Sequence, residues 1–473
     1  MSDFQSFPLP FWLVVAAIVF FAVRSWRQAE SALRLPMLMV LFTVTVWYVG
    51  DVLYNDYVWY RMEIDDICLE HAWWEVLGFV CSFGLLTPLI HRILNRKYLG
   101  RPSNLLSLIY YGGLKSEKFQ RQLDIACWFL CILWAALMII ALIRTDFDFQ
   151  GLFMPYLGKK TDPWARGRIG TGFDSLLALG NYFQIGFAAV FGVIAALAYR
   201  PSTFGVALTI WLLTLPSYIF DWTRSFILAT FLPGFLAWLF LRLRSGVLVK
   251  AAILTTGFLV IESWMKFIIA NRTELTISAA FYQTVTTGQK TGISEAKHLG
   301  LDMFEELGFI NLYIADGSYQ PNWGEEYLAQ LANPIPRSLW PDKPLIGIDY
   351  AIARGQKLDN SIEGSAGVGA TLSTGMIGQG VVNFGTVFGP LASALLTSLW
   401  VAILARQDLL AADPRRMFLY IMGLILTFNM GRDITLLVLY PFCFGYILLL
   451  VAKYWPVADA LRPPADREMD AAS

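Results

Sequence analysis

The side chains best suited to chemistry in this sequence are arginines at the edges of apolar runs. Arg224 follows the acid Asp221 by three residues at the start of one run, and Arg432 lies at a tight turn between two short runs. A guanidinium group binds phosphate oxygens through parallel hydrogen bonds, and a helix amino terminus also favours an anion. The two positions therefore predict an anion site. The alternative is a local ion pair, Arg224 with Asp221 and Arg432 with Asp433.

One long polar segment, residues 269–376, supplies further candidates. Its four prolines between 334 and 344 restrict the backbone to a stiff, extended form. Such a strip could present an aromatic face to a sugar ring and cations to a phosphate, or it could be a structural clip. The residues of the strip that we expect to contact such a ligand are Arg337, Trp340 and Lys343, and the other cations of the segment include Arg272 and Arg354.

No pattern for metal or nucleotide binding stands in the sequence. The three histidines, His71, His91 and His298, are widely separated, and the five cysteines contain no C-x-x-C pair. Neither a G-x-x-x-x-G-K-[ST] phosphate loop nor a G-x-G-x-x-G turn occurs. The formal net charge is +0, which indicates no nucleic-acid partner. We therefore expect no metal and no cofactor.

The elements that must position these residues are membrane-spanning helices. Hydrophobic residues make up 56% of the chain, charged residues 15%, and the mean hydropathy is +0.54. A helix needs about 20 consecutive apolar residues to cross a bilayer, and the first such run lacks the flanks of a cleaved signal peptide. The predicted fold is all-α, a polytopic helical membrane protein with about 11 transmembrane helices, at residues 7–23, 34–54, 71–90, 125–143, 174–198, 203–220, 225–241, 249–268, 385–405, 417–431 and 434–452.

The distribution of basic residues predicts the orientation. Of the 36 lysines and arginines, 20 fall in alternate short connections and the carboxyl-terminal tail, and 8 fall in the opposite short connections. Because positive charge favours the cytoplasmic side, the amino terminus and the large loop should lie outside and the carboxyl terminus inside. The predicted organisation is transmembrane helices 1–8 in residues 1–268, the large outer loop in 269–384, transmembrane helices 9–11 in 385–453, and a cytoplasmic tail in 454–473.

Short helices are expected within the loop. Apolar residues at helical spacing between 295 and 315 predict a helix that lies on the bilayer surface or caps the bundle. A second should begin at Gly324-Glu325-Glu326, with acids in its first turn, and end before Pro334. Glycines crowd residues 364–389, where they could cradle a ligand or permit tight helix packing. In the span before the loop, Glu262 and Lys266 have the spacing of a helical ion pair.

Three stretches of the chain resemble the oligosaccharide repeat-unit polymerases of bacterial surface polysaccharides, the O-antigen polymerase (Wzy) family. They are Thr223-Arg224-Ser225 at the start of a span, the proline-rich string 334–344, and Ser373-Thr374-Gly375 followed by Asn383-Phe384-Gly385. The resemblance covers mainly residues 215–435, and the proline-rich string is its most specific part. Gln379 stands where the family often has an acid, so no carboxylate role is carried over to that position.

The resemblance implies an enzyme, a membrane-embedded glycosyltransferase on the outer face of the bacterial inner membrane, with a periplasmic loop. It would join undecaprenyl-diphosphate-linked oligosaccharide repeat units into a surface polysaccharide, O-antigen or exopolysaccharide. The diphosphate leaves as an acceptor hydroxyl attacks the anomeric carbon, and arginines can stabilise the departing charge without a metal. The resemblance assigns Arg224 and Arg432 to the diphosphate, with Arg337 and Arg354 as further candidates; Glu325, Glu326 and Glu363 could activate the hydroxyl, and Trp323 and Trp340 could stack on sugars.

Two other interpretations stay open at this point. A ligase that transfers finished glycan onto the lipid A core shares the architecture and the anion chemistry. A flippase or transporter for a lipid-linked glycan would instead need basic residues lining a cavity that reaches mid-bilayer, and no folded outer loop. The partners expected under the polymerase interpretation are the lipid-linked oligosaccharides, membrane lipid and a chain-length regulator.

Overall fold

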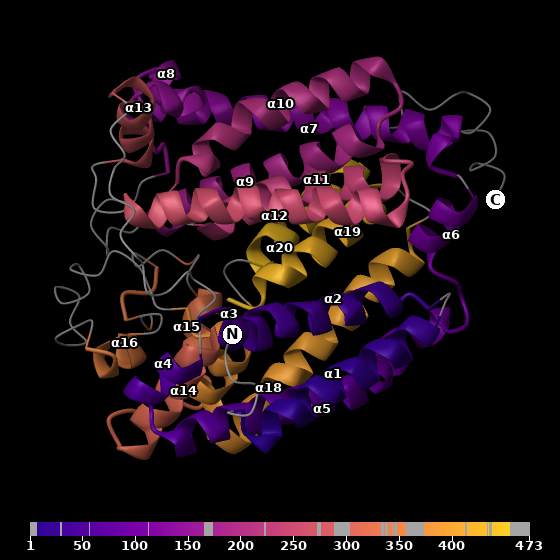
Figure 1. Ribbon diagram of the computed structural model, residues 1–473. Helices are drawn as coiled ribbons and strands as arrows, with labels where there is room; N and C mark the ends of the chain where they lie inside the picture. Colours follow the sequence, from indigo (N-terminus) through magenta and orange to yellow (C-terminus); the bar gives the residue numbers. More distant parts are fainter. Residues whose placement is uncertain are drawn as a thin grey trace.

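A computed structural model describes residues 7–28, 31–55, 57–111, 113–164, 174–221, 224–271, 276–287, 303–332, 335, 339–342, 344, 348–355, 373–411, 414–432, 434 and 438–454. Every regular element in these residues is helical (Figure 1). The longer helices are α1 (Leu9–Arg27), α2 (Arg34–Val44), α5 (Asp66–Leu94), α7 (Glu117–Arg144), α9 (Asp174–Leu197), α10 (Pro201–Ile219), α11 (Arg224–Ala237), α12 (Val247–Ala270), α13 (Ile277–Thr287), α14 (Met303–Ala315), α18 (Gly375–Leu409), α19 (Pro414–Asn429) and α20 (Tyr440–Tyr454). The shorter ones are the α-helices α3 (Asp51–Asn55), α4 (Tyr57–Glu63), α6 (Asn104–Tyr111), α8 (Phe149–Phe153), α15 (Glu325–Ala332) and α16 (Ile348–Ala353), the π-helices η2 (Thr45–Gly50) and η6 (Trp238–Arg242), and the 3-10 helices η3 (Arg96–Tyr98), η4 (Gly113–Lys115) and η5 (Pro155–Leu157).

The predicted all-α class is confirmed, and the membrane-spanning character is supported by helix length and composition. Eight helices in the described part of the chain are long and apolar enough to cross a membrane. They are Leu9–Arg27, Arg34–Leu53, Asp66–Leu94, Glu117–Arg144, Gly180–Leu197, Pro201–Ile219, Val247–Ile268 and Gly375–Leu409. Two shorter apolar helices, Phe226–Arg242 and Arg416–Asn429, lie where further spans were expected, so the number of about eleven stays a prediction.

Helix α18 is a helical hairpin rather than one straight rod. Gly385 has φ +74° and ψ 179°, a backbone conformation outside the helical region that glycine adopts at low cost. The Ser393 hydroxyl donates to the Met376 carbonyl at 2.7 Å, and the backbones of Gly380 and Gly389 are in direct contact. Both contacts are symmetric about the kink, so residues 375–384, the short arm, double back along residues 386–409, the long arm. The sequence places residues 375–384 at the end of the polar loop, and in the structure they form a helical arm that packs on residues 386–409.

Helix α14 is inserted among the spanning helices. Its residues Met303–Asn311 are all buried, and it packs against α5 and α18. The apolar pattern of this helix predicts that it lies on the bilayer surface or caps the bundle. Its contacts with α5 and α18 agree with a cap on the bundle. The second predicted loop helix is α15, which begins at Glu325 as expected. The expected ion pair in α12 is also present, with 2.8 Å between Lys266 Nζ and Glu262 Oε1.

Most of the elements from the predicted loop gather at one end of the molecule. Figure 1 shows α13, α14, α15 and α16 at the left end, together with α4 and α8, and α6 at the opposite end. Helix α5 packs along α18 and α1, while α9 packs against α10, α11, α7 and α20. Helix α19 contacts members of both sets, including α2, α18, α11 and α20. The elements that hold the candidate site are thus joined by one continuous apolar core.

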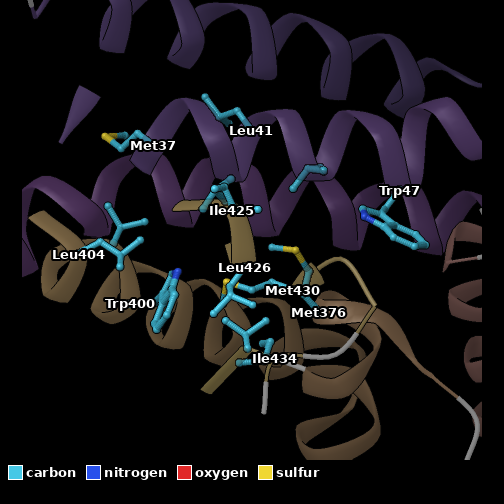
Figure 2. Close-up of a cluster of buried hydrophobic side chains, with 14 of the residues drawn as sticks. Met37, Leu41, Trp47, Met376, Trp400, Leu404, Ile425, Leu426, Met430 and Ile434 are labelled. Carbon is cyan, nitrogen blue, oxygen red and sulfur yellow. The ribbon is translucent and has the colours of Figure 1, made fainter. Parts of the chain in front are cut away.

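Figure 2 shows part of that core, where α2, α18 and α19 meet. Leu41 of α2 and Ile425 of α19 are buried there, and so is Trp400 of α18. The Trp400 indole N–H donates to the Thr427 hydroxyl at 2.9 Å, so the polar atom of this buried ring has a partner. The core therefore fixes α19, and with it the chain that follows at Met430 to Arg432.

Candidate functional site

The structure describes some of the predicted site residues and not others. Side chains are described for Arg432, Glu326, Arg354, Trp323 and Trp340. Arg224 is the first residue of α11, and only its backbone is described. The predictions for Arg337, Lys343, Arg272 and Glu363 lie outside the described residues, and so does the alternative partner Asp433.

Arg432 lies at the inner end of the short arm of α18. Its Nε donates to the Ser373 hydroxyl at 2.9 Å, and its carbonyl accepts from the Gly375 N–H at 3.2 Å. Met376, at this end of the short arm, contacts Ser393 of the long arm. Ser393 follows Gly385 by eight residues, which at a rise of about 1.5 Å per residue is about 12 Å from the hairpin turn. A guanidinium group and a helix amino terminus thus meet well inside the bundle. Both carry positive charge or partial charge, and both favour an anion.

The π-helix η2 places aromatic side chains against the same point. The Ile377 N–H donates to the Tyr48 hydroxyl oxygen at 3.0 Å. Gly375 has φ +74°, and a Cβ atom there would stand 2.6 Å from that oxygen and 3.1 Å from the Gly431 carbonyl. The Trp47 ring leaves no room for a side chain at Gly431. We call Tyr48, Ser373, Gly375 and Arg432 the Arg432 site. Neither Gly375 in this site nor Gly431 beside it has room for a side chain.

A chain of hydrogen bonds connects Ile434, two residues after Arg432, to Gln379 of the short arm and then to Glu326 on α15. The Ile434 N–H donates to Gln379 Oε1 at 3.1 Å, Gln379 Nε2 donates to Gln330 Oε1 at 3.2 Å, and Gln330 Nε2 donates to Glu326 Oε1 at 3.3 Å. The Tyr440 hydroxyl donates to the Gln330 carbonyl at 2.5 Å. The network therefore ties Glu326 to the short arm and to the chain just after Arg432. Glu326 is only 6% exposed and acts there as a buried acceptor, whereas Glu325 beside it is exposed.

Arg354 follows α16 and is held by an acid of α14. Its Nε and Nη2 donate to the two carboxylate oxygens of Glu306 at 3.4 and 3.3 Å, and its guanidinium lies 3.6 Å from the centre of the Phe309 ring. The Tyr350 hydroxyl also donates to Glu306. Burial, and then the nearby Glu306 carboxylate, raise the pKa of Tyr350. Arg354 thus ties α16 to α14, which makes it a structural contact of the loop as well as a cation near its surface.

Trp323 is presented to solvent in a strained backbone conformation. It is 72% exposed and has φ +53°, a region that bulky side chains rarely adopt. Its N–H donates to the Asn383 carbonyl at 2.7 Å, and its ring meets Phe384 edge to face. The contact attaches Trp323 to the turn end of the short arm. Trp340 has intermediate exposure.

The first turn of α11 is flanked by an ion pair that the sequence did not predict. Asp221, the expected local partner of Arg224, pairs with Lys160, and both side chains are largely buried. The Lys160 N–H also donates to the Ser278 hydroxyl of α13 at 3.0 Å. This pair and the bond to Ser278 link the segment before α11 to the chain after η5 and to α13.

Several residues of the site were not singled out from the sequence. Tyr48 and Gln330 lie far from Arg432 along the chain, and no local pattern marks their approach. Ser373 stands in one of the three stretches that carry the resemblance, and Glu306 lies in the helix predicted between 295 and 315. The sequence does carry a signal for Glu306. It is an acid within an apolar helix, and an acid that is buried in such a helix needs a hydrogen-bond or ion-pair partner.

Among the described residues, no group of three or more histidine, cysteine, aspartate or glutamate side chains could hold a metal ion. The described residues place a guanidinium group beside the amino terminus of a helical arm, two groups that each favour an anion. Comparison with protein-family models, with curated proteins and with solved structures finds no match to this chain.

Proposed function

We propose that this chain is a membrane-embedded glycosyltransferase that joins polyprenyl-diphosphate-linked oligosaccharide repeat units into a surface polysaccharide. The observation that carries the proposal is the Arg432 site. A guanidinium group and the amino terminus of a re-entrant helical arm meet about 12 Å from the hairpin turn. Together they suit the diphosphate of a lipid-linked sugar, which is anionic and must sit near the membrane.

The proposed step needs charge stabilisation more than bond activation. The acceptor hydroxyl oxygen forms a bond to the anomeric carbon, and the bond from that carbon to the diphosphate oxygen breaks with its electron pair. Arg432 stabilises the negative charge that develops on the leaving diphosphate. The hydroxyl proton goes to a carboxylate, and Glu325 is favoured over Glu326 because it is exposed. Arg224 and Arg354 stand as further cations for the two lipid-linked substrates, and Trp323 as a surface for a sugar ring.

The location belongs to the same proposal. Eleven spans with the amino terminus in the periplasm and the carboxyl terminus in the cytoplasm would place the Arg432 site on the periplasmic side of a bacterial inner membrane. The part of this arrangement that the structure supports is the placing of the loop helices α13 to α16 at one end of the molecule (Figure 1).

The test is a polysaccharide gel on a deletion strain that is complemented with wild type, Arg432→Ala or Arg101→Ala. Arg101 is an exposed arginine near α6, at the opposite end of the molecule, and serves as the matched control. We expect deletion to leave single repeats on the acceptor, and Arg432→Ala to insert normally but fail to restore the ladder. Arg101→Ala should restore it.

Other outcomes distinguish the alternatives. If deletion removes all glycan from the lipid A core while long polymer accumulates on the carrier, the ligase interpretation is correct. An unchanged ladder after deletion contradicts both enzymes. A normal ladder with Arg432→Ala would show that the anion site lies elsewhere.

A further inference from the structure

A carboxyl group is buried inside a predicted span, and no cation of the described residues pairs with it. Glu75 lies in α5, in the apolar helix Asp66–Leu94, and is 5% exposed. None of the ion pairs between described residues involves it. Its neighbour is Asn311 of α14, which is 3% exposed and donates from Nδ2 to Glu75 Oε2 at 2.9 Å. The Glu75 side chain therefore joins a spanning helix to the inserted loop helix.

This bond leaves one oxygen of each side chain without a partner. Glu75 Oε1 and Asn311 Oδ1 are both buried, and neither has a hydrogen-bond partner in the described structure. Two acceptor oxygens cannot bond to each other, and a lone buried carboxylate is costly at membrane depth. A proton on Glu75 Oε1 removes both problems at once, because a protonated carboxyl is a donor as well as an acceptor. The amide of Asn311 offers the complementary donor and acceptor on one planar edge.

We propose that Glu75 is a neutral carboxylic acid that forms a two-bond acid–amide pair with Asn311, and that this pair is a positioning contact for α14. In the pair, Asn311 Nδ2–H donates to Glu75 Oε2, and Glu75 Oε1–H donates to Asn311 Oδ1. No charge is buried, and every polar atom on the shared edge has a partner.

The position of α14 matters because this helix touches the Arg432 site. A Cβ atom on Gly375 would stand 3.1 Å from Met303 Sδ, and one on Gly378 would stand 2.9 Å from Ile310 Cδ1. Helix α14 therefore packs directly along the short arm, within one turn of its inner end. The inference about the proton is independent of the proposed function, since it concerns the resting protein and needs no substrate.

Infrared difference spectroscopy on the purified full chain tests the proton directly. The C=O stretch of a protonated carboxyl group is separate from the bands of carboxylates and amides. We expect the spectrum of wild type minus Glu75→Gln, recorded near neutral pH, to show one such band. Wild type minus Glu70→Gln should not show it, because Glu70 is an exposed acid in the same helix. Asn311→Leu should shift the band, since it removes the amide partner.

Unfolding temperatures distinguish the pair from a merely buried side chain. Glu75→Gln can rebuild both hydrogen bonds as an amide pair, so its midpoint should match that of wild type. Glu75→Leu leaves the Asn311 amide unpaired and should unfold several degrees lower. The double variant Glu75→Leu/Asn311→Leu should recover part of that loss, because removing both partners leaves no orphan. The proposal is overturned if Glu75→Gln removes no protonated-carboxyl band, or if it lowers the midpoint as much as Glu75→Leu.

Discussion

The two arms of α18 approach each other so closely at Gly389 that one added methyl group should not be tolerated. A Cβ atom on Gly389 would lie 2.5 Å from both the Cα and the N of Val381. Contacts between carbon atoms are normally about 3.5–4.0 Å, so Gly389→Ala must separate the arms by about 1 Å. The obstacle is backbone, which cannot rotate away as a side chain can.

The size of the effect follows from this displacement. Overpacking of this kind costs about 1–3 kcal/mol, against a gain of about 0.5–1 kcal/mol from replacing glycine by alanine in a helix. A shift of about 1 Å would also stretch the bond from Ser393 to Met376, now 2.7 Å, beyond hydrogen-bond length. Displacements of about 1 Å in a reacting geometry can reduce activity by about 100-fold. We therefore expect a lower unfolding temperature and a strong loss of polymer.

Gly205→Ala is the matched control. Gly205 lies in α10, and a Cβ atom there meets nothing within 4 Å. This variant should unfold at the wild-type temperature or slightly above it and keep full activity. Both variants would be purified in detergent for thermal unfolding, and expressed in a deletion strain for the polysaccharide gel. If Gly389→Ala behaves as Gly205→Ala does in both measurements, the close contact between the arms is wrong.

Three further predictions concern other parts of the site. Arg432→Lys keeps the positive charge but loses the planar guanidinium fork that binds phosphate, so the polymer yield of this variant should fall. The yield of Arg432→Ala should fall further, and both variants should still insert into the membrane. Asp51 accepts hydrogen bonds from the N–H groups at the start of α14, at 2.8 Å from Phe304, and Asp51→Ala should reduce the free energy of unfolding by about 1–3 kcal/mol in denaturant titration. Because burial and the Glu306 carboxylate raise the pKa of Tyr350, the folded protein keeps this phenol protonated while the unfolded chain loses the proton near pH ~10. The free energy of unfolding should therefore fall above about pH 10. Thermal unfolding measured from pH 8 to 11 should show a smaller fall for Tyr350→Phe than for wild type, and equal falls would show that the pKa of Tyr350 is not raised.

The spanning helices could be predicted closely because hydropathy over a long run is set by the bilayer. The span expected at 203–220 is the helix Pro201–Ile219, and the one at 249–268 lies within Val247–Ala270. The short arm of α18 was missed because its apolar residues are too few to cross a membrane. A kink at Gly385 is not readable from sequence either, since the glycines around it suit tight packing and a flexible loop equally well.

The site itself was predicted in part. Arg432 could be singled out because an arginine beside an apolar run is rare and needs a partner. The approach of Tyr48 could not, because it depends on the π-helical turn at Thr45–Gly50 and on contacts across more than 300 positions of sequence. Glu326 was chosen for its place at a helix start, and its burial became visible only once α15 was packed against α18.

The short arm shows how a helix amino terminus can lie among packed helices when the protein supplies partners for its N–H groups. A helix that spans the bilayer has its free N–H groups at the surface, and free groups within it must be satisfied by protein. Here the Gly375 N–H is bonded to the Arg432 carbonyl and the Ile377 N–H to Tyr48. At the other end, the Trp323 N–H caps the Asn383 carbonyl.

These partners come from η2, from the chain after α19 and from the loop before α15, so the arm depends on the docking of all three. The same contacts make the Arg432 site dependent on the loop. A variant that frees α15, such as Gln330→Leu, breaks the bond to Gln379 and leaves a buried amide without its partner. It should therefore reduce polymer formation even though Gln330 touches no proposed substrate. Wild-type activity in Gln330→Leu would show that the short arm holds its position without the loop.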